Sequence, residues 1–209
     1  MQENVAPKSA ASKEEILRSP IITPVDQERF PLLEHSSRFC DLPLPAEDRE
    51  QLLYMEALLE GLGNSALGLA AVQIGWPKRI FMLRHPNTGT ITTYVNPSVV
   101  AISPETSRKP EACLSLPDYS VRVSRPKRVT LSYFTPEGDK EQETFIGVRA
   151  KAVMHEIDHL NGMLITRYAE QDIRNRVNAS INKASARENM VAARRKQRKA
   201  AKKSQKRNR

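Results

Sequence analysis

The order of apolar and polar residues predicts a helix in the first half of the chain. Between Ala46 and Leu62, apolar side chains recur every three or four positions, which is the spacing of one helix face. Pro45 suits the first turn, where a missing N–H costs nothing. Gly61 and Gly63 are placed to end the helix. The apolar stripe consists of Leu52, Met55, Leu59 and Leu62, and Leu53 and Leu58 widen it.

Short apolar or alternating runs predict strands over the middle of the chain. Turn sequences separate the runs, such as the Pro-Glu-Gly-Asp of residues 136–139, and this order favours hairpins. One more short strand is expected after the second helix described below. The predicted strands are 80–83, 91–95, 98–102, 121–123, 129–133, 141–148 and 163–166.

A second helix is predicted from Arg149 to Asn161, and it carries two histidines four positions apart. His155 and His159 lie one turn apart on one face, so both rings can reach one metal ion. Glu156 follows the first histidine, where a carboxylate can handle the proton of a metal-bound water. The alternative is a buried helix with two incidental histidines. The chain has only four histidines, and two of them fall in this pattern, which therefore favours a metal site.

A metal site needs further ligands, and the sequence offers three candidates. Glu170 and Glu188 lie downstream, as in a zinc metallopeptidase. Cys113 lies upstream, and a thiolate binds zinc or ferrous iron strongly. Cys113 could equally be a buried structural cysteine, or the nucleophile of a cysteine hydrolase. The residues alone leave these alternatives open.

Residues 63–75 are mostly small, and Gln73 is the one residue after Asn64 in this run with a side-chain amide. Small residues let the backbone approach a ligand closely. A packed turn is an equally good interpretation of this run when it is taken alone.

The positive charge of the chain belongs to its C-terminal end. The net charge is +9, but residues 191–209 hold ten Lys and Arg and no Asp or Glu, which leaves 23 basic and 24 acidic residues in 1–190. Such a tail could bind a polyanion, and an RNA-binding protein acting through its tail is one hypothesis. The tail has no aromatic residue for base stacking, so sequence-specific recognition is not expected. A solvated charge run is the alternative.

Export and membrane insertion are not expected. No apolar run approaches the roughly 20 residues that span a bilayer. Residues 1–20 lack the apolar core of a signal peptide and contain three glutamates, so a cytoplasmic protein is expected. The two cysteines, Cys40 and Cys113, are then expected to be free thiols or a metal ligand rather than a disulfide.

Three motifs resemble those of peptide deformylases and occur in that family's order. The family carries Gly-x-Gly-Leu-Ala-Ala-x-Gln, then Glu-Gly-Cys-Leu-Ser, then His-Glu-x-x-His. The corresponding segments here are 66–73, 111–115 and 155–159, and the resemblance covers roughly residues 28–170. It implies an α+β fold with antiparallel sheets packed around a central metal-binding helix. It also implies removal of the N-formyl group from the formylmethionine of new polypeptides, with release of formate.

The resemblance also implies a role for individual residues. Cys113, His155 and His159 would hold the metal, with ferrous iron expected and zinc, nickel or cobalt accepted. Glu156 would transfer protons. The oxyanion would meet Gln73 and the backbone N–H of Leu114, and Gly68 would present its backbone to the substrate. The candidates for the methionine side-chain pocket are Met154 and Ile157.

Two positions depart from the family motifs, since Ala66 and Ala112 stand where the family has glycine. If either position needs a positive φ, the change costs free energy, and both methyl groups could narrow the substrate groove. Activity is expected to survive, because neither change removes a reactive group.

The chain is expected to divide into four parts and to act as a monomer. The parts are a polar extension 1–20, a catalytic domain 21–169, a C-terminal helix 170–190 and the basic tail 191–209. The family acts on chains emerging from ribosomes, so residues 170–209 are expected to bind ribosomal RNA.

Overall fold

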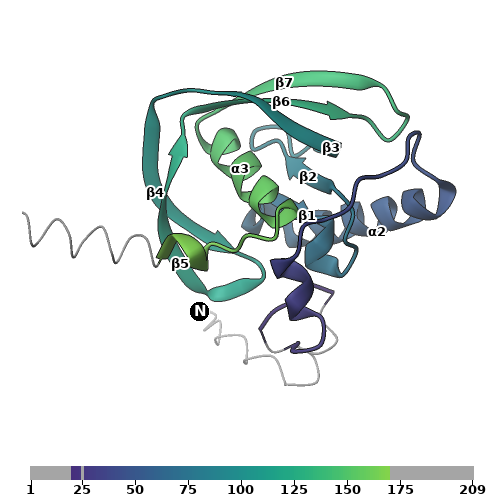
Figure 1. The fold of residues 1–209 in the computed structure, drawn as a ribbon, viewed down its shortest axis with the longest axis horizontal. Helices are drawn as coiled ribbons and strands as arrows, with labels where there is room; N and C mark the ends of the chain where they lie inside the picture. The colour runs from purple at the N-terminus through teal and green to yellow at the C-terminus, as the bar shows by residue number, and fades with distance from the viewer. Residues whose placement is uncertain (1–19, 25, 170–209) are drawn as a thin grey trace, which may run out of the picture. The chain divides into compact units, whose positions relative to one another are not determined.

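Helix α3 (Val148–Leu160) contacts strands of two antiparallel sheets (Figure 1). The computed structural model describes residues 20–24 and 26–169. The chain divides into two units, Met1–Arg167 and Tyr168–Arg209, and the fold described below is that of the first. The expected extension 1–20, except for its last residue, the helix 170–190 and the tail 191–209 lie outside the described residues.

The larger sheet has five strands in the order β1-β2-β3-β6-β7, and every pair of neighbours is antiparallel. The smaller sheet is a hairpin of β4 and β5. The strands are β1 Gly68–Ala70, β2 Ile80–Arg84, β3 Ile91–Ile102, β4 Thr106–Cys113, β5 Leu116–Pro126, β6 Arg128–Phe134 and β7 Lys140–Ile146. Short 3-10 helices lie at η1 Phe30–Glu34, η2 Gly63–Ser65 and η3 Ala71–Ile74. The predicted α+β class with antiparallel sheets around a central helix is confirmed.

The predicted first helix is confirmed as α2 (Ala46–Leu62), and it packs on one face of the larger sheet. Its buried residues Leu52, Met55 and Leu59 form one apolar cluster with strand residues such as Ile80 and Met82. Each such buried side chain contributes about 1.5–3 kcal/mol through the hydrophobic effect. Side chains alternate between the two faces of a strand, so Phe81, between Ile80 and Met82, points to the other face of the sheet.

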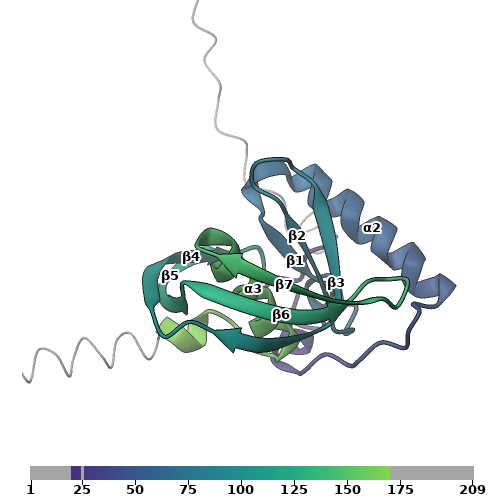
Figure 2. The ribbon, with the colours of Figure 1, turned by 90° about the horizontal axis from the view of Figure 1, so that it is seen from above.

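The opposite face of the sheet is aromatic and packs against α3. The Phe81 and Tyr94 rings stack with centroids 4.8 Å apart, and Phe145 contacts Tyr94 edge-on. The guanidinium of Arg149, in the first turn of α3, lies over the Phe145 ring. Figure 2 shows α2 and α3 on opposite sides of β2 and β3. The sheet is therefore covered on both faces, and α3 is held in a fixed position.

Strand β3 runs from Ile91 to Ile102, so the prediction of two strands separated at residues 96 and 97 was wrong. The register of β3 against β6 shifts between Val95 and Ser98, and Asn96 has a φ of 48°. A bulge of this kind tolerates Pro97, which has no N–H to give to the ladder. The Asn96 side chain instead exchanges two hydrogen bonds with the backbone of Cys40.

The predicted second helix is confirmed to within one residue at each end, whereas the strand expected after it does not form. Residues 163–165 have no regular structure, and residues 166–169 form a helical turn. Leu164 and Ile165 are buried, so the apolar run reflects burial rather than strand pairing. Strand β7 also ends earlier than predicted, because Gly147 takes a φ of 62° as the residue before α3. None of the described helices is long and apolar enough to cross a membrane.

Gly162 fixes the chain where it leaves α3, and we expect its replacement by alanine to destabilise the fold. Its φ is +69°, and a Cβ there would lie 2.7 Å from the carbonyl oxygen of Glu34. The left-handed conformation alone costs about 1–2 kcal/mol for a residue with a side chain, and the contact with backbone adds to it. Urea unfolding of Gly162→Ala should therefore show a loss of about 2 kcal/mol or more in the free energy of unfolding.

Gly61→Ala is the matched control, because a Cβ at Gly61 would meet nothing within 4 Å and the residue lies in α2. Alanine favours a helix over glycine by up to about 1 kcal/mol, so this variant should be neutral or more stable. Equal stability of the two variants would show that the close approach to Glu34 is not a constraint.

Candidate metal centre

Cys113, His155 and His159 converge in space although Cys113 lies far from the histidines in sequence. Cys113 ends β4, and both histidines lie on α3. One potential ligand atom from each lies within 4.8 Å of the others, and the Cys113 Sγ is 3.2 Å from the His159 Nε2. The rings of His155 and His159 face one point because they are one helical turn apart. The donor set can therefore surround a single ion.

The end of α3 is anchored by partners from the N-terminal part of the described chain. The backbone N–H of Ser37 donates to the Leu160 carbonyl at 2.9 Å, and Arg79 Nη1 donates to the same carbonyl at 3.1 Å. These bonds satisfy a carbonyl that a helix end leaves without an intrahelical partner. They hold the turn that carries His159.

A buried network of charged side chains lies next to the centre. The Arg125 guanidinium donates two bonds to Glu111, of 3.0 and 2.9 Å, and a third to Asp158, of 2.7 Å. All three side chains are buried. Arg125 lies on β5, Glu111 on β4 and Asp158 on α3. The network therefore ties the hairpin that carries Cys113 to the helix that carries the histidines.

Glu111 also orients His155, since its Oε2 lies 3.3 Å from the His155 Nδ1. A carboxylate accepts a hydrogen bond from the N–H of this nitrogen, which leaves the Nε2 lone pair free to face the centre. Burial lowers the pKa of His155, but hydrogen bonds with Cys113 and Glu111, together with nearby negative charge, raise it to about 10. Surroundings that stabilise a proton on this ring also stabilise a metal cation, because the two compete for the same lone pair.

His159 has the opposite electrostatic environment. Burial lowers its pKa well below the usual value, and the positive charges of His155 and Arg125 add to this effect. The ring is therefore neutral near pH 7, which is the form that binds a metal.

Glu156 is buried beside the centre, and its Oε2 has no hydrogen-bond partner among the described residues. Burial raises the pKa of this carboxyl to about 7, with His155 lowering it and Glu111 and Asp158 raising it. Its Oε1 lies where a Cβ on Gly68 would be 2.5 Å away, so only glycine at position 68 leaves room for this carboxylate. A carboxyl of this pKa can both accept and release a proton near neutral pH.

Gln73 is buried with its amide oriented by β1. The Ala70 N–H donates to the Gln73 Oε1 at 2.9 Å, which turns Nε2 toward the Ser115 hydroxyl at 3.1 Å. The same Nε2 lies 3.8 Å from the Cys113 Sγ. A primary amide donor is thus fixed next to the centre.

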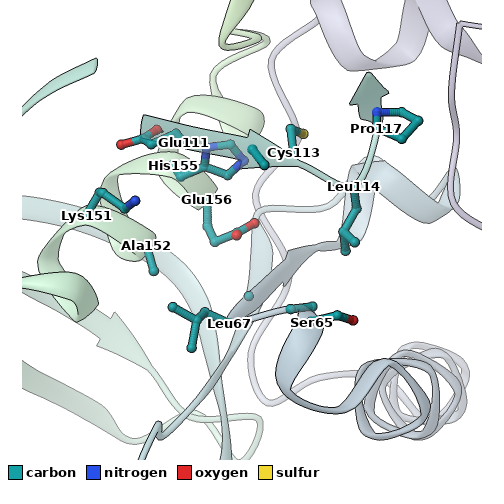
Figure 3. Close-up of a pocket in the computed structure, with 13 residues that line it drawn as sticks. Ser65, Leu67, Glu111, Cys113, Leu114, Pro117, Lys151, Ala152, His155 and Glu156 are labelled. Atoms are coloured by element: carbon teal, nitrogen blue, oxygen red, sulfur yellow. Dashed lines mark hydrogen bonds and ion pairs between the residues drawn. The ribbon is translucent and has the colours of Figure 1, made fainter. Parts of the chain in front are cut away.

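A pocket of about 380 Å³ opens onto the centre (Figure 3). Five of the predicted site residues line it, and Gln73 and His159 are buried next to it. Met154 and Ile157 are not among its lining residues, and their role in binding a methionine side chain stays a prediction. The lining residues are Ser65, Ala66, Leu67, Gly68, Glu111, Ala112, Cys113, Leu114, Pro117, Lys151, Ala152, His155 and Glu156.

Both alanines that replace motif glycines line this pocket without backbone strain. Ala66 is extended, with a φ of −130°. Asn96 is the one residue other than glycine with a positive φ within the described ranges, so Ala112 also avoids that region. The two methyl groups therefore affect the shape of the pocket rather than the conformation of the chain.

The sequence did not reveal the network of Glu111, Arg125 and Asp158. Asp158 carried a signal, because it lies three positions after His155 on the same helix side. Arg125 carried none, because nothing in the sequence pairs it with Glu111, fourteen residues away on the other strand of the hairpin. Lys151 and Ala152 were also missed, although they precede His155 by four and three positions.

The family model for polypeptide deformylase matches residues 28–175. A peptide deformylase of Rhizobium meliloti (strain 1021) is 40% identical over 147 residues, which are 68% of this chain and 84% of the relative. A peptide deformylase of Agrobacterium fabrum (strain C58) is 34% identical over 142 residues, 66% of this chain and 84% of the relative.

Solved structures of peptide deformylases have the same fold. The enzyme of Ehrlichia chaffeensis superposes with a TM-score of 0.65 at 28% identity, covering 79% of this chain and 95% of the other. A class I type b peptide deformylase of Acinetobacter baumannii, solved with bound Met-Ala-Ser, superposes with a TM-score of 0.62 at 26% identity. That superposition covers 71% of this chain and 96% of the other.

Removal of the Arg125 guanidinium should destabilise the protein strongly. Arg125→Ala removes the guanidinium that pairs with the buried carboxylates of Glu111 and Asp158. Breaking a buried ion pair by removing one partner costs about 3–5 kcal/mol. Urea denaturation of the purified variant measures this loss.

Arg122→Ala is the control, because Arg122 is exposed on the same strand. It should change the free energy of unfolding by no more than about 0.5 kcal/mol. An Arg125→Ala variant as stable as Arg122→Ala would mean that the network contributes nothing to the fold.

Proposed function

This chain belongs to the polypeptide deformylase family, and we propose that Cys113, His155 and His159 hold the divalent metal with which it removes the N-formyl group from nascent polypeptides. The observation that carries the proposal is the convergence of one thiol and two imidazoles beside a buried carboxyl. Three of these groups, those of Cys113, His155 and Glu156, line a pocket of about 380 Å³, and His159 is buried next to it.

The donor set fits a metal in its chemistry, and the Cys113–His159 pair fits in its spacing. Metal bonds of about 2.0–2.3 Å to nitrogen and sulfur put the ligand atoms of a tetrahedral site about 3.5 Å apart. The 3.2 Å between Cys113 Sγ and His159 Nε2 is close to this value. Three protein ligands leave a fourth position for the reaction. The family resemblance favours ferrous iron, and zinc, nickel and cobalt suit the same ligands.

When held by Cys113, His155 and His159, a divalent cation would supply Lewis-acid chemistry at the formyl oxygen and would lower the pKa of water. Glu156 then moves the protons of the hydrolysis. Its carboxyl, with a pKa raised to about 7, accepts the proton of the attacking water and passes it to the departing amine. The absence of a hydrogen-bond partner for its Oε2 within the described part of the chain leaves this oxygen available for that exchange.

Two donors suit the negative charge that develops on the formyl oxygen. The Gln73 amide is held by Ala70, so its Nε2 needs no reorientation during the reaction. The backbone N–H of Leu114 follows Cys113 at the end of β4, and Leu114 lines the pocket. We assign the oxyanion to these two donors.

Two strand edges can take up the backbone of a peptide. Among the described strands, β1 is the last in its sheet and β4 has β5 as its one ladder partner. The pocket runs between residues 65–68, at β1, and 111–114, at β4. An extended peptide between them gains main-chain hydrogen bonds from either edge. A relative was solved with Met-Ala-Ser bound, which supports the binding of a short peptide.

Apart from its carbonyl, a formyl group carries only a hydrogen atom. A pocket narrowed by the methyl groups of Ala66 and Ala112 would therefore admit formyl and reject larger acyl groups.

The metallopeptidase and RNA-binding hypotheses receive no support from the comparisons, which all point to deformylases.

Glu156→Gln and Cys113→Ser should separate catalysis from metal binding. Glu156→Gln keeps the shape of the side chain but cannot accept a proton, so formate release from formyl-Met-Ala-Ser should fall by about 10²-fold or more with the metal retained. Cys113→Ser should lose metal, because a hydroxyl is a much poorer ligand than a thiolate. Formate release and metal content are measured on the same samples.

Glu137→Gln, an exposed turn residue, serves as the control and should match the wild type in both measurements. Loss of metal from Glu156→Gln would reject the proposal that Glu156 transfers protons without helping to hold the metal. Normal metal content and turnover in Cys113→Ser would reject the ligand assignment. Labelling of Cys113 by a thiol-directed acyl analogue, with activity insensitive to chelators, would favour a cysteine hydrolase instead.

We also propose that residues 170–209 bind ribosomal RNA. The support is the run of ten basic residues without an acidic one in 191–209. Contacts between lysine or arginine and phosphate are screened by salt, so binding should weaken steeply as salt rises. Deletion of 191–209 should lower cosedimentation with ribosomes at low salt while formyl-Met-Ala-Ser hydrolysis stays unchanged. Unchanged cosedimentation would refute the role of the tail.

A further inference from the structure

Lys151 places a positive charge in the wall of the pocket. It lies on α3, one helical turn before His155, and lines the pocket together with Ala152. Figure 3 shows the two side chains on the side of the pocket opposite Leu114. Lys151 is half-buried, so its charge is partly removed from water. Charge interactions are stronger at such a site than on an open surface.

No acidic side chain neutralises this charge within the described ranges. The Lys151 Nζ donates one hydrogen bond, of 2.8 Å, to the neutral backbone carbonyl of Pro110. An ammonium group has three donors, so two remain. Glu111 is the nearest acidic residue along β4, but Arg125 binds both of its oxygens and His155 binds one of them. Among the residues that the structure describes, Lys151 therefore has no anionic partner.

Ala152 on α3 and Leu67 on the β1 side are apolar residues of the pocket wall. Two carboxylates also line the pocket, but Glu111 is bound by Arg125 and His155, and the Glu156 carboxylate lies against Gly68. An anionic oxygen brought by a ligand would be the best partner for the ammonium group, because a hydrogen bond between two charged groups is stronger than one to a neutral carbonyl.

Resting on the proposed deformylase activity, we propose that Lys151 is a specificity-determining residue that favours formyl peptides with a carboxylate side chain near the formyl group. The carboxylate can belong to the formylated residue or to the one that follows it. In either case it takes up the two free Lys151 donors while the formyl group lies at Cys113, His155 and His159.

Lys127 provides a matched control for the charge. It lines a neighbouring hollow of about 270 Å³, which Lys151 also borders, but it does not line the pocket itself. Removal of Lys127 changes the net charge by the same amount as removal of Lys151. A difference between the two variants therefore reports contact rather than the overall field of the protein.

The test compares four formyl peptides in two pairs, each pair differing by a carboxylate and its neutral amide. The first pair is formyl-Glu-Ala-Ser and formyl-Gln-Ala-Ser, and the second is formyl-Met-Glu-Ser and formyl-Met-Gln-Ser. For each pair the ratio of kcat/KM, Glu over Gln, is measured in the wild type, Lys151→Met, Lys151→Arg and Lys127→Met. One charged hydrogen bond corresponds to about tenfold in such a ratio.

We expect the ratio of one pair to fall about tenfold in Lys151→Met and to hold in Lys151→Arg and Lys127→Met. The pair that responds shows which residue carries the carboxylate. Lys151→Gln guards against a folding defect of the methionine variant and should give the same result. An unchanged ratio in both pairs, or an equal fall in Lys127→Met, would overturn the proposal.

Failure of the proposed function has a different signature, which is the absence of formate release from formyl-Met-Ala-Ser by metal-loaded wild type. Calorimetric binding of the product peptides then decides the role of Lys151. Met-Glu-Ser or Glu-Ala-Ser should bind more tightly than its Gln counterpart to the wild type but not to Lys151→Met. Equal binding in both pairs would reject the role of Lys151 independently of catalysis.

Discussion

The arrangement of this site depends on one buried guanidinium, that of Arg125. It pairs with Glu111 on β4 and with Asp158 on α3, and it lies itself on β5. The two strands of one hairpin and a helix that follows later in the chain are thus joined at a single cation. Because burial of each ion alone would cost several kcal/mol, the partners favour the one arrangement in which all are paired.

The same network reaches the reactive groups through single contacts. Glu111 accepts hydrogen bonds from both Arg125 and the His155 ring. Asp158 lies one position before His159. The negative charge of Glu111 and Asp158 also contributes to the raised pKa of Glu156. Structure and reactivity are therefore coupled: the carboxylates that hold the hairpin to the helix also tune the proton affinity of the carboxyl beside the centre.

The sequence predicted the local features well and the distant pairings poorly. Helices α2 and α3 and the pairing of His155 with His159 follow from spacing within one element, where the period of the helix fixes which side chains meet. Cys113 was one of several ligand candidates until the motifs were compared with a family, because residues alone do not show which strand end lies over a helix. Its position next to His159 is a property of the fold.

The errors have physical reasons of the same kind. Strand β3 continues through Pro97 because a bulge absorbs the missing donor, and this bulge depends on partners in other parts of the chain. Leu164 and Ile165 resemble a strand because they are apolar, yet they are buried without pairing. Periodicity registers burial and does not reveal what covers a residue.

The three proposed ligands lie on a hairpin and a helix, so metal binding affects the stability of the fold. Cys113 and His159 are separated by 46 positions, so an ion bound to both is a cross-link that closes a long loop of the chain. The free energy of metal binding then adds to the stability of the native state. Among the larger contacts between elements, the hairpin of β4 and β5 meets the rest of the fold through α3, and this cross-link joins the same two parts. With the ligands as proposed, metal supply would determine how long the folded protein persists, as well as whether it can react.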